Sequence, residues 1–422
     1  MTWLRSLKVF TNHRIDLGIG DMENYEFRFA MIQKLTEKPP VTVGIAGSGN
    51  LEVTIKPRTD DTDTVFQVST PVGGYQDTWL AAFERFVEDY PFSSLTYIIN
   101  DAGASPPAVS LRLRQAFEAY QLGYKTGNDY LELDARARIY SLVDEHRFEE
   151  FLVGEDCSSP NLAALNIQIG RDDGVVIGIA MIAQQKIAIA AQQKEFIGGS
   201  VGEVHGAKLI GLIRYAIRNK LDAIVLLIDS GGVRLQEANV GEIEISETIQ
   251  ALLDARTAGI KTIGVVCGDN GAYGGMSIIT GCLDYVMVNR VARIGVSGAE
   301  VIQAVKGIEG FDASDRSLMW RVYGGRTRYM QKAVQAYVSN QIIEIRKCIV
   351  NALSTLNASD LLTVDNAKKR HEQLRHRVKS AKDAVEQGAW LTEYGHGLKD
   401  SIFNTSDAEF IKTVNKGDKT WP

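Results

Sequence analysis

The stretch Asp229-Ser230-Gly231-Gly232-Val233-Arg234 is followed, about 40 residues later, by Asn270-Gly271-Ala272-Tyr273-Gly274-Gly275. Each stretch comes soon after an apolar run, AIVLLI at 223–228 or TIGVVC at 262–267, that has the composition of a buried strand. Each is followed by residues with helical periodicity. Strands that alternate with helices in this way predict a parallel sheet with helices on its faces, which is an α/β fold.

Glycine turns between a strand and a helix leave backbone N–H groups without partners where the helix begins. Two such donors that face one point form an oxyanion hole. A thioester carbonyl that becomes an enolate needs two aimed donors and no side chain in the way, a condition that glycine meets. A single turn of this kind is more often a structural corner. The ordered pair favours an oxyanion hole.

Length and composition narrow the class of protein. A chain of 422 residues is expected to form two or three domains, and a net charge of −6 gives no reason to expect a nucleic-acid partner. No apolar run approaches the roughly 20 residues that span a bilayer, so no membrane segment is expected. The four cysteines lack CxxC spacing. They indicate reduced thiols in a cytoplasmic protein and no metal site.

The order of predicted elements divides the chain into five parts. An N-terminal extension, 1–24, has no sustained apolar stretch and does not resemble a signal peptide. A small α/β domain is expected at 25–121, with a hairpin at Gly49-Asn50, and a polar linker at 122–130. The larger α/β domain is predicted at 131–338. A charge-dense helical tail follows at 339–422.

Four motifs of the larger domain carry a family resemblance: FIGGSVGEVHGAK, DSGGVRLQEAN, NGAYGGMS and RIGVSGAEVI, in that order. They resemble the carboxyltransferase branch of the crotonase-like superfamily, and within it the beta subunit of biotin-independent malonate decarboxylase. The resemblance extends from about 131 to 337. It implies that a malonyl thioester on a carrier loses carbon dioxide through an enolate held in a backbone oxyanion hole.

The small domain carries a second resemblance, in AGSGNLEV and INDAGASPPAVSLRLRQAFE. These motifs are similar to the delta subunit of the same enzyme, its acyl-carrier protein. The chain therefore resembles a fusion of delta and beta subunits. The resemblance implies that Ser48 carries 2'-(5''-phosphoribosyl)-3'-dephospho-CoA, whereas a serine between two glycines is by itself ordinary turn chemistry. No Met-Lys-Met biotin acceptor occurs, so no bound biotin is expected.

The resemblance also assigns site residues. It implies oxyanion donors at Gly231-Gly232-Val233 and at Gly274-Gly275. Three further groups keep a structural alternative beside the functional one. They are the possible pocket loop at Ser297 and Gly298, a possible seat for the prosthetic arm at Gly198, Gly199 and Lys208, and the candidate proton donors Tyr273, Glu237 and His205.

Partners follow from the same resemblance. Active sites in this family lie where two crotonase-like domains meet, and this chain has one, so a gamma-type crotonase-like subunit is expected. An alpha-type acyl-carrier transferase and the prosthetic-group and malonyl transferases complete the set. Two other readings stay open: a carboxyltransferase subunit that acts on an acyl-CoA with biotin, and a non-catalytic scaffold and carrier for a catalytic gamma subunit.

Overall fold

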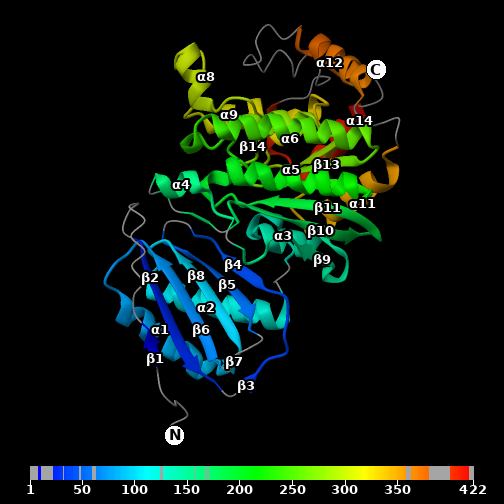
Figure 1. Cartoon of the computed structure of the whole chain (residues 1–422). Helices are drawn as coiled ribbons and strands as arrows, with labels where there is room; N and C mark the ends of the chain where they lie inside the picture. The colour runs from blue at the N-terminus through cyan, green and yellow to red at the C-terminus, as the bar shows by residue number, and fades with distance from the viewer. Residues whose placement is uncertain are drawn as a thin grey trace. The chain divides into compact units, whose positions relative to one another are not determined.

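The computed structural model in Figure 1 describes residues 8–10, 22–31, 33–46, 49–58, 63–123, 127–155, 157–165, 167, 169–170, 172–357, 363–379 and 400–417. Ser48 lies outside them. The chain forms two compact units, one of Met1–Lys125 with Phe151–Gly174 and one of Thr126–Glu150 with Val175–Pro422. The segment Phe151–Gly174, which the sequence assigned to the larger domain, therefore packs with the smaller unit.

The first unit is a six-stranded sheet with the order β1-β2-β6-β8-β5-β4. Two helices, α1 (Gln76–Asp89) and α2 (Pro106–Leu122), follow two of its strands. The strands are β1 (Lys8–Phe10), β2 (Glu23–Ala30), β4 (Val41–Gly44), β5 (Leu51–Pro57), β6 (Asp63–Thr70) and β8 (Leu95–Asp101). A pair of two-residue strands, β3 (Gln33–Lys34) and β7 (Phe92–Ser93), lies outside the sheet order. A short helix, α4 (Pro160–Ala164), belongs to the segment Phe151–Gly174.

The predicted antiparallel pairing of these two strands is confirmed, with Gly44 of β4 opposite Glu52 of β5. The connection runs over 45–50 and is longer than the two-residue turn at Gly49-Asn50 that the sequence predicts. Aromatic packing holds α1 to the sheet. The Phe66 ring stacks on the Phe83 ring at a centroid distance of 4.3 Å and on the Tyr97 ring at 4.6 Å. Pairs of this kind stabilise a core beyond their buried area.

The second unit is a seven-stranded sheet with the order β17-β15-β13-β12-β11-β10-β9. Its strands from β11 to β17 are parallel neighbours, and β9, β10 and β11 are antiparallel neighbours. The strands are β9 (Phe148–Glu150), β10 (Val175–Ile182), β11 (Gln185–Gln192), β12 (Ala223–Ile228), β13 (Lys261–Val266), β15 (Tyr285–Val288) and β17 (Ala336–Tyr337). A separate pair is formed by β14 (Ala272–Tyr273) and β16 (Ile294–Gly295).

Helices cover both faces of this sheet, as the parallel strands require because their side chains are apolar on both sides. In Figure 1, α5 (Glu203–Arg218) and α6 (Asn239–Thr257) run side by side, and α5 packs against β10, β11 and β12, while α3 (Ala135–Leu142) packs against β10 and β11. The other helices are α7 (Gly275–Gly281), α8 (Ala299–Lys306), α9 (Arg316–Tyr323), α10 (Gly325–Met330), α11 (Ile342–Thr355), α12 (Val364–Lys379) and α14 (Asp407–Gly417). The α/β fold class is confirmed. Among the described residues, no helix combines the length and the apolar character needed to cross a membrane.

The region after 338 is joined to the second unit more closely than a peripheral tail would be. Ile345 and Ile349 of α11 are fully buried in the core cluster that also contains Val225 and Val265 of the sheet. Farther along, the buried Arg326 of α10 donates to the carbonyls of Ile402, Phe403 and Thr405 and to the carboxylate of Asp407. One guanidinium thus fixes the start of α14.

Replacing Arg326 with Met should detach the segment 400–417, because its carbonyls and the Asp407 carboxylate lose their buried donor. Hydrogen–deuterium exchange of peptides from this segment should become at least about tenfold faster. Lys347→Met is the control, since it removes an exposed ion pair with Glu344. Equal exchange in Arg326→Met and the unaltered chain would contradict the anchoring role.

Candidate active site

The two glycine turns meet at one edge of the parallel sheet. They follow the neighbouring strands β12 and β13, whose carboxyl ends lie side by side. Ser230 N–H donates to the Gly271 carbonyl at 2.8 Å, and Tyr273 N–H donates to the Ser230 carbonyl at 3.1 Å. A Cβ on Gly274 would lie 3.4 Å from the Gly232 Cα, so the turns touch backbone to backbone.

Two of the five predicted positions offer unused donors. Among the backbone hydrogen bonds of the described residues, none uses the N–H of Val233 or of Gly275. Gly275 begins α7, where an N–H has no partner within the helix. The N–H groups of Gly231, Gly232 and Gly274 are bonded inside the protein, to the Gly198 carbonyl, the Ser230 hydroxyl and the Gly295 carbonyl.

Backbone conformation explains why glycine stands at the contact. Gly232 has φ 118° and Gly274 has φ 53° with ψ −131°, a combination that residues with a side chain avoid. A Cβ on Gly232 would also lie 3.0 Å from the Tyr273 carbonyl oxygen. Substitution at either position therefore costs both strain and the close approach of the two turns.

A third glycine turn, at Gly198-Gly199, is hydrogen-bonded to both of these turns. The Gly198 carbonyl accepts from Gly231 N–H at 2.8 Å and from the Asn270 side chain at 3.1 Å, so it ties both turns together. Gly199 has φ 65°, and a Cβ there would lie 2.1 Å from the Asp229 carbonyl oxygen. The contacts of Gly198 and Gly199 are those of close packing, the structural alternative noted above.

Asp229 joins the turns through its charge. Its Oδ2 pairs with Arg138 Nη1 at 2.8 Å, and its Oδ1 accepts from Asn270 N–H at 2.7 Å. The side chains of Arg138 and Asp229 are 2 % and 0 % exposed. Burial lowers the pKa of Arg138, but Tyr130 and Asp229 outweigh it and the pKa is raised. The guanidinium also lies 4.4 Å from the Tyr130 ring centroid.

Sequence reasoning missed this pair. Arg138 stands within LELDARARIYSL, about 90 residues before Asp229, and the only signal was an arginine in an otherwise apolar part of a helix. Such an arginine needs a buried anion, because an unpaired charge is expensive in a core.

Glu237 is occupied by structural contacts. Its Oε1 pairs with Arg234 Nη1 at 3.1 Å, with both side chains 0 % exposed. Its Oε2 accepts from Glu203 N–H at 2.6 Å, at the start of α5. Because both oxygens are bonded, the carboxylate positions α5 beside the first turn.

His205 and Lys208 also lie inside the second unit. His205 is fully buried, with Nε2 3.1 Å from Nε2 of Gln192, whose Oε1 accepts from Asp229 N–H. Lys208 is 7 % exposed, and its ammonium donates to the Val175 carbonyl in β10. These side chains face the sheet because they stand on the inner side of α5, so the contacts of Lys208 are those of helix–sheet packing, the structural alternative for this residue.

Tyr273 is half-buried beside the second turn. Its ring packs edge-on against the Tyr323 ring, at a centroid distance of 5.7 Å, over Gly295. Burial raises the pKa of Tyr273, and the charges of Arg293 and Arg328 oppose that rise. The phenol therefore stays protonated at neutral pH.

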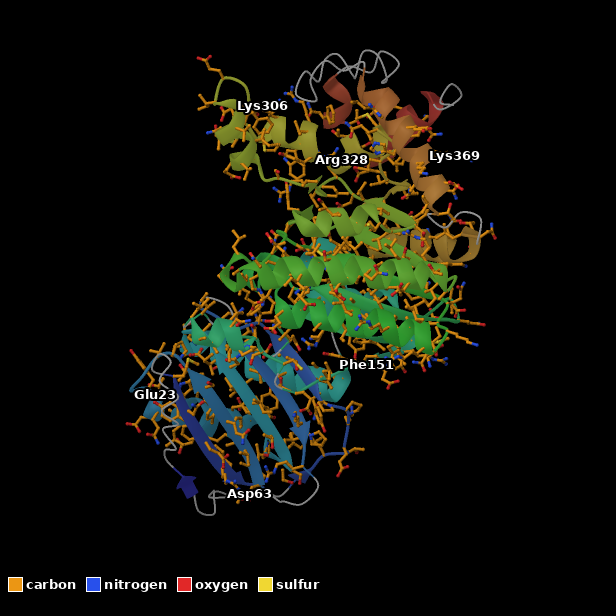
Figure 2. All side chains as sticks on the ribbon, turned by 45° about the horizontal axis from the view of Figure 1, so that its top comes forward. Glu23, Asp63, Phe151, Lys306, Arg328 and Lys369 are labelled. Carbon is orange, nitrogen blue, oxygen red and sulfur yellow. The ribbon has the colours of Figure 1, made fainter. Side chains whose placement is uncertain are left out.

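A pocket of about 400 Å³ lies next to this region. Ser277 of α7, Gly295 and Val296 of the loop and Arg328 of α10 line it. Arg328, labelled in Figure 2, donates to the Ile294 carbonyl at 2.7 Å. The predicted Ser297 and Gly298 follow Val296 and are half-buried, but they are not among the residues that line the pocket.

Comparison with known proteins identifies the framework that carries these turns. Residues 131–385 match the carboxyl transferase domain family. The chain belongs to this family. Residues 38–120 match the malonate decarboxylase delta subunit (MdcD), so this carboxyl transferase chain also includes an acyl-carrier domain.

Two curated proteins and one solved structure are similar to this chain. The chain is 35 % identical over 216 residues to a malonyl-S-ACP:biotin-protein carboxyltransferase of Malonomonas rubra, covering 48 % of this chain and 68 % of that protein. It is 32 % identical to an acetyl-coenzyme A carboxylase carboxyl transferase subunit beta of Fusobacterium nucleatum, covering 42 % of this chain and 60 % of that protein. A chain from a Pseudomonas malonate decarboxylase hetero-tetramer in complex with malonate aligns with a TM-score of 0.56 and 33 % identity, over 61 % of this chain and 96 % of that one.

Replacing Asp229 with Ala should lower the free energy of unfolding by about 3–5 kcal/mol, because Arg138 keeps its buried charge without a partner. Urea unfolding measures the loss. The double variant Arg138→Met/Asp229→Leu should recover part of it. Glu247→Ala, which breaks the exposed pair with Arg214, is the control and should cost less than about 1 kcal/mol. A loss in the double variant equal to the sum of the losses in the single variants Arg138→Met and Asp229→Leu would argue against a coupled pair.

Proposed function

We propose that this carboxyl transferase chain is the carrier and decarboxylase component of a malonate decarboxylase. One observation carries the proposal: the N–H groups of Val233 and Gly275 are unused in the described structure and stand on turns that touch each other. Two such donors are what the oxygen of a thioester requires when negative charge collects on it. The family match and the malonate decarboxylase relative support the same substrate class.

The proposed reaction places the thioester oxygen of malonyl-carrier between Val233 N–H and Gly275 N–H. The bond between the carboxylate and the methylene carbon breaks, and its electron pair passes into the thioester to give the enolate. Carbon dioxide leaves. One aimed donor is typically worth about 2.7–4 kcal/mol of transition-state stabilisation, so the pair supplies a large part of the acceleration.

The enolate carbon must then take up a proton to give acetyl-carrier. Both carboxylate oxygens of Glu237 are bonded inside the protein and His205 is fully buried beside Gln192, whereas Tyr273 stands half-buried on the second turn with a pKa raised by burial. We assign the proton to Tyr273 or to water that it orders, because a protonated phenol beside the turns has a proton to give.

The carrier role rests on the hairpin between β4 and β5. Ser48 lies outside the described residues, but its neighbour Gly49 has φ 75° and a Cβ there would meet nothing within 4 Å. Such an open tip fits attachment of a bulky group. When bound, 2'-(5''-phosphoribosyl)-3'-dephospho-CoA supplies the thiol that holds the malonyl group as a thioester.

A gamma-type crotonase-like subunit is proposed to complete the site, with an alpha-type transferase to load the carrier. The hetero-tetrameric state of the Pseudomonas relative supports an assembly of several subunits. The runner-up function is transfer of the carboxyl group to biotin. The name of the Malonomonas relative favours it, so product analysis should include a biotinylated acceptor.

Gly274→Ala should lower malonyl-thioester turnover at least about a hundredfold, because its Cβ would lie 3.8 Å from Val233 N and cover that donor. Carbon dioxide release is measured with the gamma-type subunit present and absent. Gly259→Ala is the matched control: Gly259 also has positive φ, 79°, but nothing lies within 4 Å of its Cβ position. Normal turnover in a folded Gly274→Ala variant would mean that the reaction takes place on the gamma-type subunit.

Ser48 should carry the prosthetic group. Intact-mass measurement of the chain, co-expressed with its modifying enzymes, should reveal a CoA-derived addition that Ser48→Ala abolishes. Ser110→Ala, which alters an exposed serine on α2 of the same unit, should keep the addition. An addition that persists in Ser48→Ala would refute the assignment.

A further inference from the structure

The first unit contains a pocket of its own, of about 270 Å³. Its floor is formed where the parallel strands β6 and β8 end, at Thr70 and Asp101. Its sides come from the first turns of α1 and α2, which begin at this edge. Ligand sites of open α/β sheets typically lie at the carboxyl ends of parallel strands.

This pocket lies beside the hairpin tip. Gly49 N–H donates to the Ala102 carbonyl at 2.9 Å, and Ala102 N–H donates to the Asn50 carbonyl at 2.9 Å. The residues on both sides of Ala102, Asp101 and Gly103, line the pocket. A group attached at the tip therefore begins next to the pocket.

The lining is mostly apolar and partly aromatic. Trp79 is 6 % exposed, while Tyr75 and Val72 are 53 % and 38 % exposed at the mouth. Ala82, Ala104, Pro106 and Val109 form much of the remaining wall. Exposed aromatic and apolar side chains around a concave site are typical of a ligand pocket.

One charged group belongs to the wall. Asp101 is 3 % exposed, and its carboxylate accepts from the Thr70 hydroxyl at 2.7 Å and from Ala104 N–H at 2.9 Å. Each carboxylate oxygen can accept a further bond. The negative charge disfavours a phosphate or a malonyl carboxylate in the pocket, whereas an amino group on a neutral ring suits it.

Size selects the occupant further. Sites for whole drug-sized ligands typically measure roughly 300–1,000 Å³, so this pocket fits one ring system and not an entire nucleotide. We propose that it binds the adenine of the CoA-derived group carried at the neighbouring hairpin, with Tyr75 and Trp79 against the ring and Asp101 accepting from its amine. This inference rests on the proposed carrier function. It means that the carrier holds the base end of its arm while the thiol end stays mobile.

Calorimetric titration of the full, unmodified chain tests the pocket without using activity. Adenosine and dephospho-CoA should bind, pantetheine and pyrophosphate should not, and inosine, which lacks the amine, should bind at least about tenfold more weakly. Ala82→Leu fills the pocket and should abolish binding. Ala81→Leu, the exposed neighbour on the same helix, should leave binding unchanged.

The chain loaded at Ser48, verified by intact mass, should no longer bind added adenosine because its own base occupies the pocket. Absence of adenosine binding to the unmodified chain, equal binding of inosine, or binding of pantetheine or pyrophosphate in its place would overturn the proposal. If the chain binds adenosine but gains no addition at Ser48 after co-expression with its modifying enzymes, the covalent arm as occupant and the carrier function would be overturned, while the adenine site itself would stand.

Discussion

The buried Asp229 carboxylate is the constraint on which the rest of the candidate active site depends. It accepts from Asn270 in the second glycine turn and pairs with Arg138 of α3. A buried charge is stable only with such partners, so the pair restricts where the two strand ends can lie relative to each other. The Gly198 carbonyl, which accepts from Gly231 and Asn270, also joins the two turns, through uncharged hydrogen bonds.

This arrangement bears on how backbone groups alone would form the proposed oxyanion hole. Oxyanion stabilisation needs donors that are fixed before the reaction begins, because donors that must reorient spend part of their energy on reordering. The strands that carry the turns have buried side chains except at Lys261, and the closely packed core around Val225 and Val265 resists displacement. Rigid strands, glycine contacts and a buried ion pair together hold Val233 N–H and Gly275 N–H in place.

In each unit, the features of interest lie at the carboxyl ends of neighbouring parallel strands. In the second unit the glycine turns follow the parallel strands β12 and β13. In the first unit, the pocket lined by Trp79 and Asp101 and the hairpin tip lie at the edge where the parallel strands β6 and β8 end. Helices begin at this edge in each case, because a chain that leaves a parallel strand must cross back over the sheet. The proposed attachment site and the proposed reaction site therefore stand at the same kind of sheet edge, each in its own unit.

The sequence by itself determined the α/β class, the antiparallel pairing of the strands on either side of Gly49-Asn50 and the alternation of strands and helices around both glycine turns, because apolar periodicity and glycine position are local properties. It did not determine which residues meet across long separations. Only the tertiary structure paired Arg138 with Asp229, buried Glu237, His205 and Lys208, and packed 151–174 with the smaller unit. The tertiary structure also decided which amides lack partners: Val233 and Gly275 differ from Gly231 and Gly274 only because distant carbonyls, those of Gly198 and Gly295, reach the latter two. Such contacts depend on three-dimensional packing, which no local pattern encodes.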